Sequence, residues 1–284
     1  MVRNRGAPAD LTLAMTPSPA STVVYDGSLA GLLCVVFDVF DLDVRPARVE
    51  REARHAPSMF GTPVRVASDP ERAARVWRGL EGVDGFDESL VLRCWLYDTT
   101  ASDTDVVHLC ARVFRQGAAA ARDFGDEAVF RCEQVRKKMN REIHRTHAFV
   151  RFAEAEDGLY LARIEPDFDV LPLAVAHFED RYQDQEWIIW DERRRYGFWF
   201  TPGNATAVRV DARSFARDDG EQRALTPGHQ VGMAAHEDGF QRLWGAYFQS
   251  VNIAARANPK LHLAHVPRRY WRHLTEKRPD ATAS

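Results

Sequence analysis

Basic side chains gather in one stretch of this sequence, residues 131–151, which contains seven arginines and lysines and two glutamates. With about 100° of rotation per residue, a helix here places its apolar side chains on one stripe and its basic side chains opposite them. The stripe consists of Cys132, Val135, Met139 and Ile143, and the basic side consists of Lys137, Lys138, Arg141, His144 and Arg145. Such a face can follow a phosphate backbone and displace its counterions. A solvated helix face without a ligand is the alternative, and both stay open.

Residues 256–273 form a second basic segment, with five arginines and lysines, no acidic residue and two aromatic rings. Cations interleaved with aromatic side chains suit a surface that holds phosphates and stacks bases. The candidate contacts in this segment are Arg268, Arg269, Tyr270 and Trp271. In the alternative interpretation, Tyr270 and Trp271 anchor the C-terminal segment to the core and the arginines face water. We interpret a third basic group as an exposed loop between strands, formed by Arg193, Arg194 and Arg195.

Three carboxylates follow the end of an expected strand and are the candidates for a metal site. Glu165, Asp167 and Asp169 offer the oxygen ligands that Mg²⁺ prefers. No acidic-x-lysine pattern follows on the next strand, as a metal-dependent nuclease would need, so a turn and helix cap is the favoured alternative. His144 and His147 have a spacing compatible with metal, but no acidic helper accompanies them. We therefore expect no metal and no cofactor in this chain.

The composition is that of an ordinary globular protein. Hydrophobic residues make up 45% of the 284 residues and charged residues 28%, which excludes a largely disordered chain. The net charge of −3 means that any contact with nucleic acid depends on local basic patches. No apolar run reaches the roughly 18 to 20 residues of a membrane span. Four cysteines lie far apart, without a CxxC pair or the triplet of an iron–sulfur site, and are expected as reduced core residues in a cytoplasmic protein; they are Cys34, Cys94, Cys110 and Cys132.

The expected fold class is α+β, and the N-terminal half is expected to be mainly helical. Residues 1–21 are interpreted as a disordered tail, 22–275 as a single domain with a helical part over 22–147, and 276–284 as a second tail. A short strand over 22–25 is followed by an Asp26-Gly27 turn and by Ser28 as a helix N-cap. The spacing of apolar residues predicts a helix after Ser28 and further helices over 71–80, 88–97 and 105–116.

The second half, residues 148–275, is expected to contain the sheet. Alternating apolar and β-branched or aromatic residues predict strands over 148–152, 159–164, 186–190 and 196–200, with 208–210 as a fifth candidate. A helix is predicted over 170–182, despite Pro172 in its first turn. The result is a mostly antiparallel sheet of four or five strands packed with the helical half. Residues 202–230 are expected as loops, and a long C-terminal helix is expected to bury Phe240, Trp244 and Phe248.

Several stretches, taken in order, resemble one bacterial family, the "probable DNA metabolism proteins", which is defined as a domain of unknown function. They are Tyr25-Asp26-Gly27-Ser28 with Gly31-Leu32-Leu33, residues 145–152, Glu165-Pro166-Asp167 with Pro172-Leu173 and His177-Phe178, Leu243-Trp244 with Tyr247-Phe248, Asn258-Pro259, and Pro267-Arg268-Arg269-Tyr270-Trp271 with Leu274. The set covers roughly residues 22 to 275. The chain departs from the family pattern over 192–200, where three arginines replace a serine-bearing turn.

The resemblance implies a context and no mechanism. Family members accompany a putative DNA modification or repair radical SAM protein, and a similar domain is fused to uracil-DNA-glycosylase-like proteins. The leading hypothesis is therefore an accessory DNA-binding protein in DNA repair or modification, with DNA and one of these proteins as partners. A metal-dependent nuclease or phosphoesterase that uses Glu165, Asp167 and Asp169 is one alternative. An adaptor that binds only proteins, through its basic faces, is another.

Overall fold

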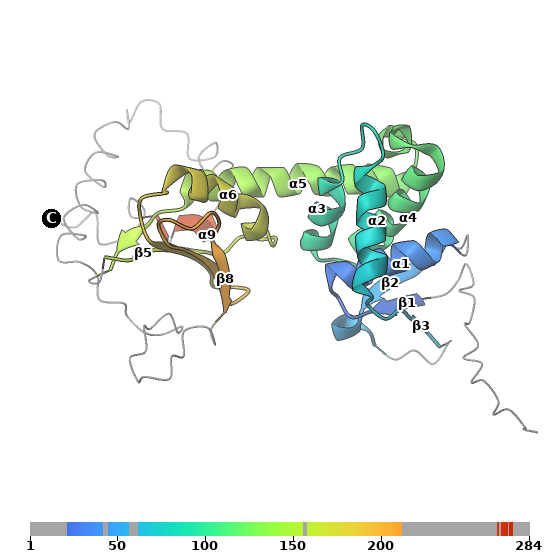
Figure 1. Cartoon of the computed structure of the whole chain (residues 1–284), viewed down its shortest axis with the longest axis horizontal. Helices are drawn as coiled ribbons and strands as arrows, with labels where there is room; N and C mark the ends of the chain where they lie inside the picture. Colours follow the sequence, from blue (N-terminus) through green and yellow to red (C-terminus); the bar gives the residue numbers. More distant parts are fainter. Residues whose placement is uncertain are drawn as a thin grey trace, which may run out of the picture. The chain divides into compact units, whose positions relative to one another are not determined.

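The computed structural model of the chain describes residues 22–41, 45–56, 62–155, 158–211, 266, 268–271 and 273–274 (Figure 1). The chain divides into two compact units, residues 1–136 and 137–284, and each is described by itself below. Helices and two sheets together make up an α+β protein, as the sequence predicts. In the part of the chain that the structure describes, no helix is both long and apolar enough to cross a membrane.

The first unit contains a small parallel sheet that the sequence only partly predicts. Strand β1 (Thr22–Tyr25) lies between β2 (Arg48–Arg51) and β3 (Val64–Arg65), and it pairs with both in parallel. Only β1 was expected. A short 3₁₀ helix, η1 (Glu52–Arg54), follows β2 directly.

Helix α1 (Leu29–Asp41) follows β1 after a tight turn, and the predicted cap is confirmed. The Ser28 hydroxyl accepts a hydrogen bond from the Gly31 amide at 2.9 Å, and the Asp26 carboxylate accepts from both the amide and the hydroxyl of Ser28. Gly27 turns the chain with a φ of 89°. A Cβ on Gly31 would lie 2.3 Å from the Asp26 carboxylate, so the first turn of α1 requires glycine there.

Two further helices of the first unit begin at side-chain caps. Asp69 caps α2 (Pro70–Glu81), and Thr99 forms a capping box with Ser102 at the start of α4 (Thr100–Gln116). This capping box explains why α4 begins five residues earlier than its apolar spacing predicts. Helix α3 (Ser89–Tyr97) and the 3₁₀ helix η2 (Ala118–Arg122) complete this unit before α5. The four cysteines are free thiols and are buried.

Helix α5 (Glu127–Phe149) begins in the first unit and continues into the second. The predicted strand over 148–152 is wrong, because α5 continues to Phe149 and only Ala153–Glu154 form a strand, β4. The apolar residues that suggested a strand instead pack around the core of the second unit, to which Val150 and Phe152 contribute. Tertiary packing therefore overrides a local pattern that fits either structure.

The second unit contains a five-stranded sheet in the order β4-β5-β6-β7-β8. Its further strands are β5 (Tyr160–Ile164), β6 (Trp187–Asp191), β7 (Tyr196–Phe200) and β8 (Val208–Asp211). Three of the four pairings are antiparallel, and only β5 and β6 run parallel. The mostly antiparallel sheet is thus confirmed.

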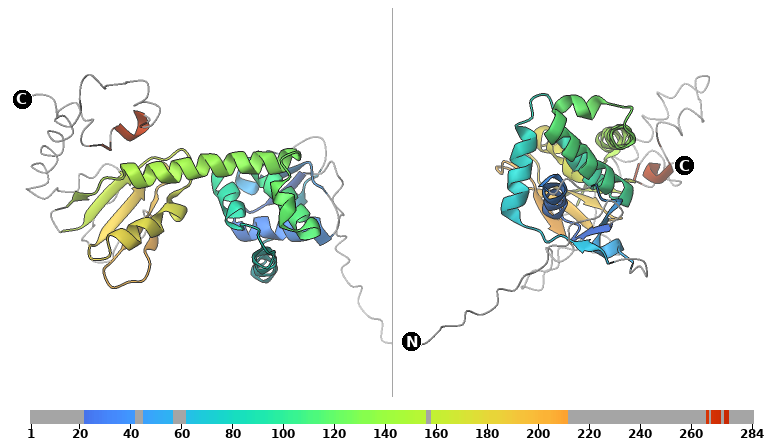
Figure 2. Two further views of the ribbon diagram at one scale, coloured as in Figure 1. Left: turned by 90° about the horizontal axis from the view of Figure 1, so that it is seen from above. Right: turned by 90° about the vertical axis from the view of Figure 1, so that its right-hand side faces the viewer.

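Helix α6 (Leu171–Arg181) connects the parallel pair β5 and β6 and lies against the sheet (Figure 2). Its buried side chains belong to the same hydrophobic cluster as those of the sheet. The core between them contains Phe178 of α6 against Trp187 and Phe200 of the sheet, and Ile143 of α5 packs against the same cluster. A short helix near the C-terminus, α9 (Arg268–Trp271), belongs to this unit. The predicted C-terminal helix with Phe240, Trp244 and Phe248, and the loop residues beyond 211, lie outside the described residues.

Candidate nucleic-acid interface

The part of α5 that belongs to the second unit has the cationic outer face that the sequence predicts. Lys137, Lys138, Arg141 and His144 are exposed, whereas Met139 on the opposite stripe is fully buried. Between residues 137 and 149 the sequence contains a single acidic residue, Glu142. The exposed side of this helix segment is therefore positively charged. We call Lys137, Lys138, Arg141, His144 and Arg145 the α5 cationic face.

Glu142 is buried to 1% exposure, on the inner side of α5. Its carboxylate accepts a hydrogen bond from Arg145 at 3.3 Å, and the two side chains form an ion pair. Burying a carboxylate is unfavourable unless it is paired and hydrogen-bonded. Glu142 meets this requirement through partners that come from three parts of the second unit.

The second predicted segment contributes one of these partners. The Tyr270 hydroxyl of α9 donates a hydrogen bond of 2.7 Å to Oε1 of Glu142, and its ring lies 5.5 Å from that of Phe149. Tyr270 is only 3% exposed. Its ring is therefore not presented to solvent for base stacking, and it anchors α9 to α5, which is the alternative left open in the sequence.

Arg268 and Trp271 of α9 are more accessible than Tyr270. Arg268 is exposed, and its guanidinium lies 6.0 Å from the centre of the half-buried Trp271 ring. The Trp271 indole N–H donates to the Val266 carbonyl at 3.0 Å. Arg269 belongs to α9, but its side chain lies outside the described residues. Tyr270 thus joins the two predicted basic segments within one unit.

The third partner of Glu142 lies in the segment that contains the candidate metal ligands. The Asp167 amide donates to Oε1 of Glu142 at 3.0 Å, and the Arg194 guanidinium donates to the carbonyls of Pro166 and Asp167 at 3.1 and 3.0 Å. The loop over 165–169 is therefore held from both sides by side chains of α5 and of the β6–β7 connection. Three of the segments that carry the family resemblance meet at Glu142.

The carboxylates of this loop point to separate contacts. Asp167 is exposed, whereas Asp169 is half-buried and accepts a short hydrogen bond from the Tyr196 hydroxyl. Burial raises the pKa of Asp169 above its usual range, against the opposing effects of the Tyr196 hydrogen bond and the Arg194 charge. Burial likewise raises the pKa of Tyr196, helped by the Asp169 charge. Among the described residues, no group of three histidine, cysteine, aspartate or glutamate side chains has a geometry that could hold a metal ion.

The arginine-rich loop over 193–195 connects β6 and β7, as predicted. The buried Asp191 carboxylate accepts from the amides of Arg193 and Arg194 and from the Arg194 guanidinium at 2.9 Å. Arg195 closes the turn with a φ of 58°. Arg193 and Arg195 are exposed, whereas Arg194 is directed into the contacts described above. The departure from the family pattern at this loop thus supplies a structural contact.

A pocket that sequence reasoning missed lies at the C-terminal end of α5. Its volume is about 600 Å³, and the described residues that line it come from the end of α5, α6, β5 and the neighbouring loops. His147 and His177 stack there with ring centres 4.3 Å apart. Burial lowers the pKa of His147, and the charges of His177 and His144 lower it further. Both histidines lie within segments that carry the resemblance, but nothing in the sequence places them in contact.

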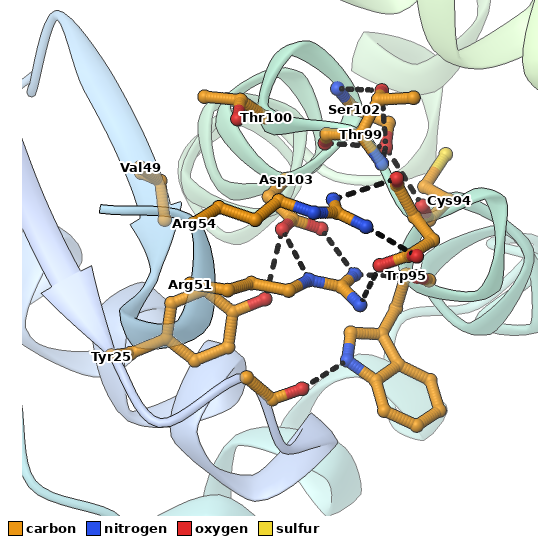
Figure 3. A network of polar contacts seen from close by, with 12 residues as sticks. Tyr25, Val49, Arg51, Arg54, Cys94, Trp95, Thr99, Thr100, Ser102 and Asp103 are labelled. Atoms are coloured by element: carbon orange, nitrogen blue, oxygen red, sulfur yellow. Dashed lines mark hydrogen bonds and ion pairs between the residues drawn. The ribbon is translucent and has the colours of Figure 1, made fainter. Parts of the chain in front are cut away.

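A polar network in the first unit joins several secondary-structure elements (Figure 3). The fully buried Asp103 carboxylate accepts from Nε and an Nη of Arg51 at 2.8 and 2.9 Å and from the Tyr25 hydroxyl at 2.9 Å. Arg51 also donates to the Trp95 carbonyl and to Asp98. The donors and acceptors of this network satisfy one another and come from β1, β2, α3 and α4. The network therefore links these four elements.

Comparison with known protein families gives a match to the second half of the chain and part of the first. A family model described as a domain of unknown function, DUF4130, matches residues 101–276. This range is more than half of the chain and contains α5, the five-stranded sheet and α9, whereas the parallel sheet of the first unit lies before it. No curated protein and no solved structure shows significant similarity to the chain.

Proposed function

We propose that this chain, which belongs to the DUF4130 family of domains of unknown function, is an accessory DNA-binding protein in DNA repair or modification. The observation that carries the proposal is the α5 cationic face together with the Tyr270–Glu142 hydrogen bond, which fastens the second basic segment to the same helix. DNA is the polyanion that the family resemblance suggests.

Electrostatics supports a local and salt-sensitive contact. The whole chain carries a net charge of −3, so long-range attraction to a polyanion is weak. The α5 cationic face nevertheless concentrates several positive side chains on about two turns of helix, and the acidic residue between them, Glu142, is buried. Each phosphate that such a face neutralises releases condensed counterions, which favours binding at low salt.

Anchoring of α9 supports a second point of contact. Glu142 and Phe149, which hold Tyr270, are three and four residues from Arg145 along the same helix, so that α9 is attached to the helix that carries the α5 cationic face. A cation held in advance by a rigid element loses less conformational freedom on binding than a cation on a free tail. Trp271, half-buried beside Arg268, is the remaining candidate for contact with a base.

The catalytic partner in this proposal is a radical SAM protein or a uracil-DNA-glycosylase-like protein. Radical SAM chemistry needs a cluster bound by closely spaced cysteines, and the four cysteines of this chain are buried and far apart in sequence. The partner would therefore supply the chemistry, and this chain would hold the DNA.

The test is a fluorescence-anisotropy titration of labelled single- and double-stranded DNA with the full chain at several salt concentrations. We expect binding that weakens steadily between about 50 and 200 mM salt, with a logarithmic slope of about 0.7 to 0.9 for each phosphate contacted. The double variant Lys137→Glu/Arg141→Glu should weaken binding at least tenfold and reduce the slope by about one to two, because two exposed cations of the face are reversed.

The matched control is Arg75→Glu/Arg78→Glu, which changes the net charge by the same amount on exposed positions of α2. This control should leave binding within about twofold of the wild type, since the two arginines do not belong to the α5 cationic face and exposed charges are screened by salt. Equal losses in both double variants would show a nonspecific charge effect and overturn the proposal. Absence of DNA binding at 50 mM salt together with stable co-purification of a protein partner would favour the adaptor instead.

A further inference from the structure

The pocket at the end of α5 has a composition that the proposed function does not use. Its volume of about 600 Å³ lies within the range of about 300–1,000 Å³ that is usual for small-molecule sites. The pocket lies wholly within the second unit. Its described lining comprises His147, Ala148, Val150, Arg151, Phe152, Tyr160, His177, Phe178, Arg181, Tyr182 and Gln185.

Aromatic rings form a large part of the lining and hold one another in place. The Phe152 ring meets the rings of Phe178 and Tyr182 edge to face, with centres 6.0 and 5.3 Å away. Phe178 is buried, whereas Phe152 and Tyr182 are only partly buried. Rings fixed in this way offer a preformed apolar surface for a planar ligand, at little cost in side-chain entropy.

Positive charge lies beside the rings. Arg181 is exposed, its guanidinium lies 5.8 Å from the centre of the Tyr182 ring, and its Nε donates to the Tyr182 hydroxyl at 3.4 Å. The Arg151 guanidinium donates to the carbonyls of Ala148 and Val150, which fixes its position at the end of α5. No carboxylate occurs among the described residues of the lining. The pocket therefore favours an anion.

The stacked histidines add a polar wall. His147 contacts the Ala174 carbonyl through Nε2 at 3.2 Å, so that this nitrogen carries the proton and donates. The second nitrogen of a neutral imidazole is an acceptor, and Gln185 adds both a donor and an acceptor to the lining. Apolar rings, two guanidiniums and a few amide and imidazole groups are together the partners that a base and its phosphate require.

We propose that this pocket binds a single unstacked nucleotide, with its base among Phe152, Tyr160 and Tyr182 and its phosphate near Arg151 and Arg181. The inference goes beyond the proposed function, because the α5 cationic face can bind a DNA backbone without the pocket. The pocket can likewise bind a nucleotide without a contact between the α5 cationic face and DNA. The nucleotide has two possible sources with the same chemistry, namely a free nucleotide and the terminal or extruded nucleotide of a DNA strand.

The experiment is isothermal titration calorimetry of the full chain with each of the four deoxynucleoside 5′-monophosphates, the matching nucleosides and inorganic phosphate. We expect saturable binding of at least one monophosphate, weaker binding of its nucleoside by about tenfold, and weak binding of phosphate alone. Arg181→Gln should weaken monophosphate binding about tenfold, and Tyr182→Leu should weaken the nucleoside and the monophosphate alike. Arg181 is exposed, so its replacement leaves the fold intact, which a thermal melt checks.

The strand arm uses a short 5′-phosphorylated oligonucleotide as competitor. Tighter binding of the oligonucleotide than of the free monophosphate, with both lost in Arg181→Gln, assigns the pocket to a nucleotide of a strand. Equal or weaker binding of the oligonucleotide assigns it to a free nucleotide. Either outcome supports nucleotide binding in the pocket.

No saturable binding of any monophosphate up to about 5 mM would overturn the inference. Binding that survives both pocket variants but disappears in Lys137→Glu/Arg141→Glu would also overturn it, because the ligand would then occupy the α5 cationic face. Conversely, loss of DNA binding in the pocket variants is not expected for long duplexes. The experiments therefore distinguish a failure of the proposed nucleotide binding in the pocket from a failure of the proposed DNA binding by the α5 cationic face.

Discussion

Tyr270 and Glu142 are 128 residues apart in the sequence, and the tyrosine hydroxyl lies 2.7 Å from the buried glutamate carboxylate. This hydrogen bond connects the C-terminal helix α9 to the middle of α5. It also connects the two basic segments, 131–151 and 256–273, for each of which the sequence predicts a role from its own charge pattern. The second basic segment is therefore attached to α5 by a polar contact inside the protein, beside the packing of Tyr270 on Phe149.

Replacement of Tyr270 by phenylalanine should loosen α9. The substitution keeps the ring that packs on Phe149 but removes one donor from a buried carboxylate, which costs about 1–3 kcal/mol. We expect faster hydrogen exchange in residues 268–274 and a lower free energy of unfolding in urea. Hydrogen-exchange mass spectrometry and urea denaturation measure the two effects.

The control for this prediction is Tyr182→Phe, whose hydroxyl makes a long contact of 3.4 Å with Arg181 at the surface. It should change stability by less than about 0.5 kcal/mol. A double-mutant cycle with Glu142→Gln isolates the coupling between the two side chains. A coupling near zero would contradict the anchoring role of the hydrogen bond.

Arg51 is the side chain on which the polar network of the first unit depends. Arg51→Met leaves the fully buried Asp103 without its ionic partner, and breaking such a pair costs about 3–5 kcal/mol. The matched control is Arg65→Met, because the Arg65–Glu52 pair is more than half exposed on both sides and contributes at most about 1 kcal/mol. Urea denaturation followed by circular dichroism compares the two variants.

The loss in Arg51→Met should also depend on pH. Burial already raises the pKa of Asp103, and the Arg51 hydrogen bonds and charge oppose this effect. Without Arg51 the folded-state pKa rises further above the unfolded value, so the penalty is full at neutral pH and is relieved as the pH falls and Asp103 takes up a proton. The deficit relative to wild type should therefore shrink between pH 7 and pH 5, and a constant or growing deficit would contradict the assignment.

The fold was predictable where local patterns and caps agree with tertiary packing. Strand β7 was predicted over the same residues, 196–200, because its aromatic alternation is bounded by a loop, and α1 was predicted from its apolar spacing and the Ser28 cap. Strand β2 was missed because its sequence Arg-Val-Glu-Arg resembles an exposed segment. Its Arg51 is charged but pairs with Asp103, a contact across 52 residues that no local pattern contains.

The candidate nucleic-acid interface likewise combines features that local patterns predict with features that depend on contacts between distant residues. The α5 cationic face follows from helical periodicity alone, so its exposed residues were predicted individually. The position of Glu142 is also visible in the sequence, because this acid lies on the inner side of α5 near the apolar stripe. An acid at such a position needs partners. Those partners, Tyr270 and the Asp167 amide, come from segments that are distant in sequence. The pocket was not predictable, because it requires the end of α5 and helix α6 to meet.

His108 should make the stability of the first unit depend on pH. Its Nδ1 accepts from Arg45 and its Nε2 donates to the Pro46 carbonyl, which is the hydrogen-bonding pattern of a neutral ring. Burial, followed by the Arg45 charge, lowers the pKa of His108, although Asp105 and Asp126 oppose this effect. Below the unfolded pKa of about 6.5 the unfolded chain binds the extra proton first, so stability falls as the pH decreases.

The measurement compares wild type with His108→Gln in urea between pH 5.5 and pH 9. Glutamine retains a donor and an acceptor but does not titrate, so the difference in unfolding free energy between the two proteins should be constant above about pH 7.5. Below that pH the wild type should lose stability relative to the variant. A wild type that gains relative stability on acidification would show that His108 is charged in the folded protein.

Arg194 should be the structurally important member of the arginine-rich loop. Its guanidinium pairs with the fully buried Asp191 carboxylate and holds the carbonyls of Pro166 and Asp167. Because Arg194 is itself about one-fifth exposed, Arg194→Met should cost towards the lower end of the about 3–5 kcal/mol expected for a broken buried pair. Arg193→Met, at an exposed position in the same loop, should cost less than about 0.5 kcal/mol.

Replacement of the adjacent residue, Arg195, should change the stability in the opposite direction. Arg195 has a φ of 58°, a backbone region that is strained for residues with a Cβ and open to glycine. Arg195→Gly should therefore leave stability unchanged or raise it by up to about 1 kcal/mol, although it removes the same positive charge as the other two variants. Thermal melts of the three variants separate the effects of charge and geometry. Equal losses in all three would indicate that the charge of the loop, and not the Asp191 contact, stabilises the β6–β7 connection.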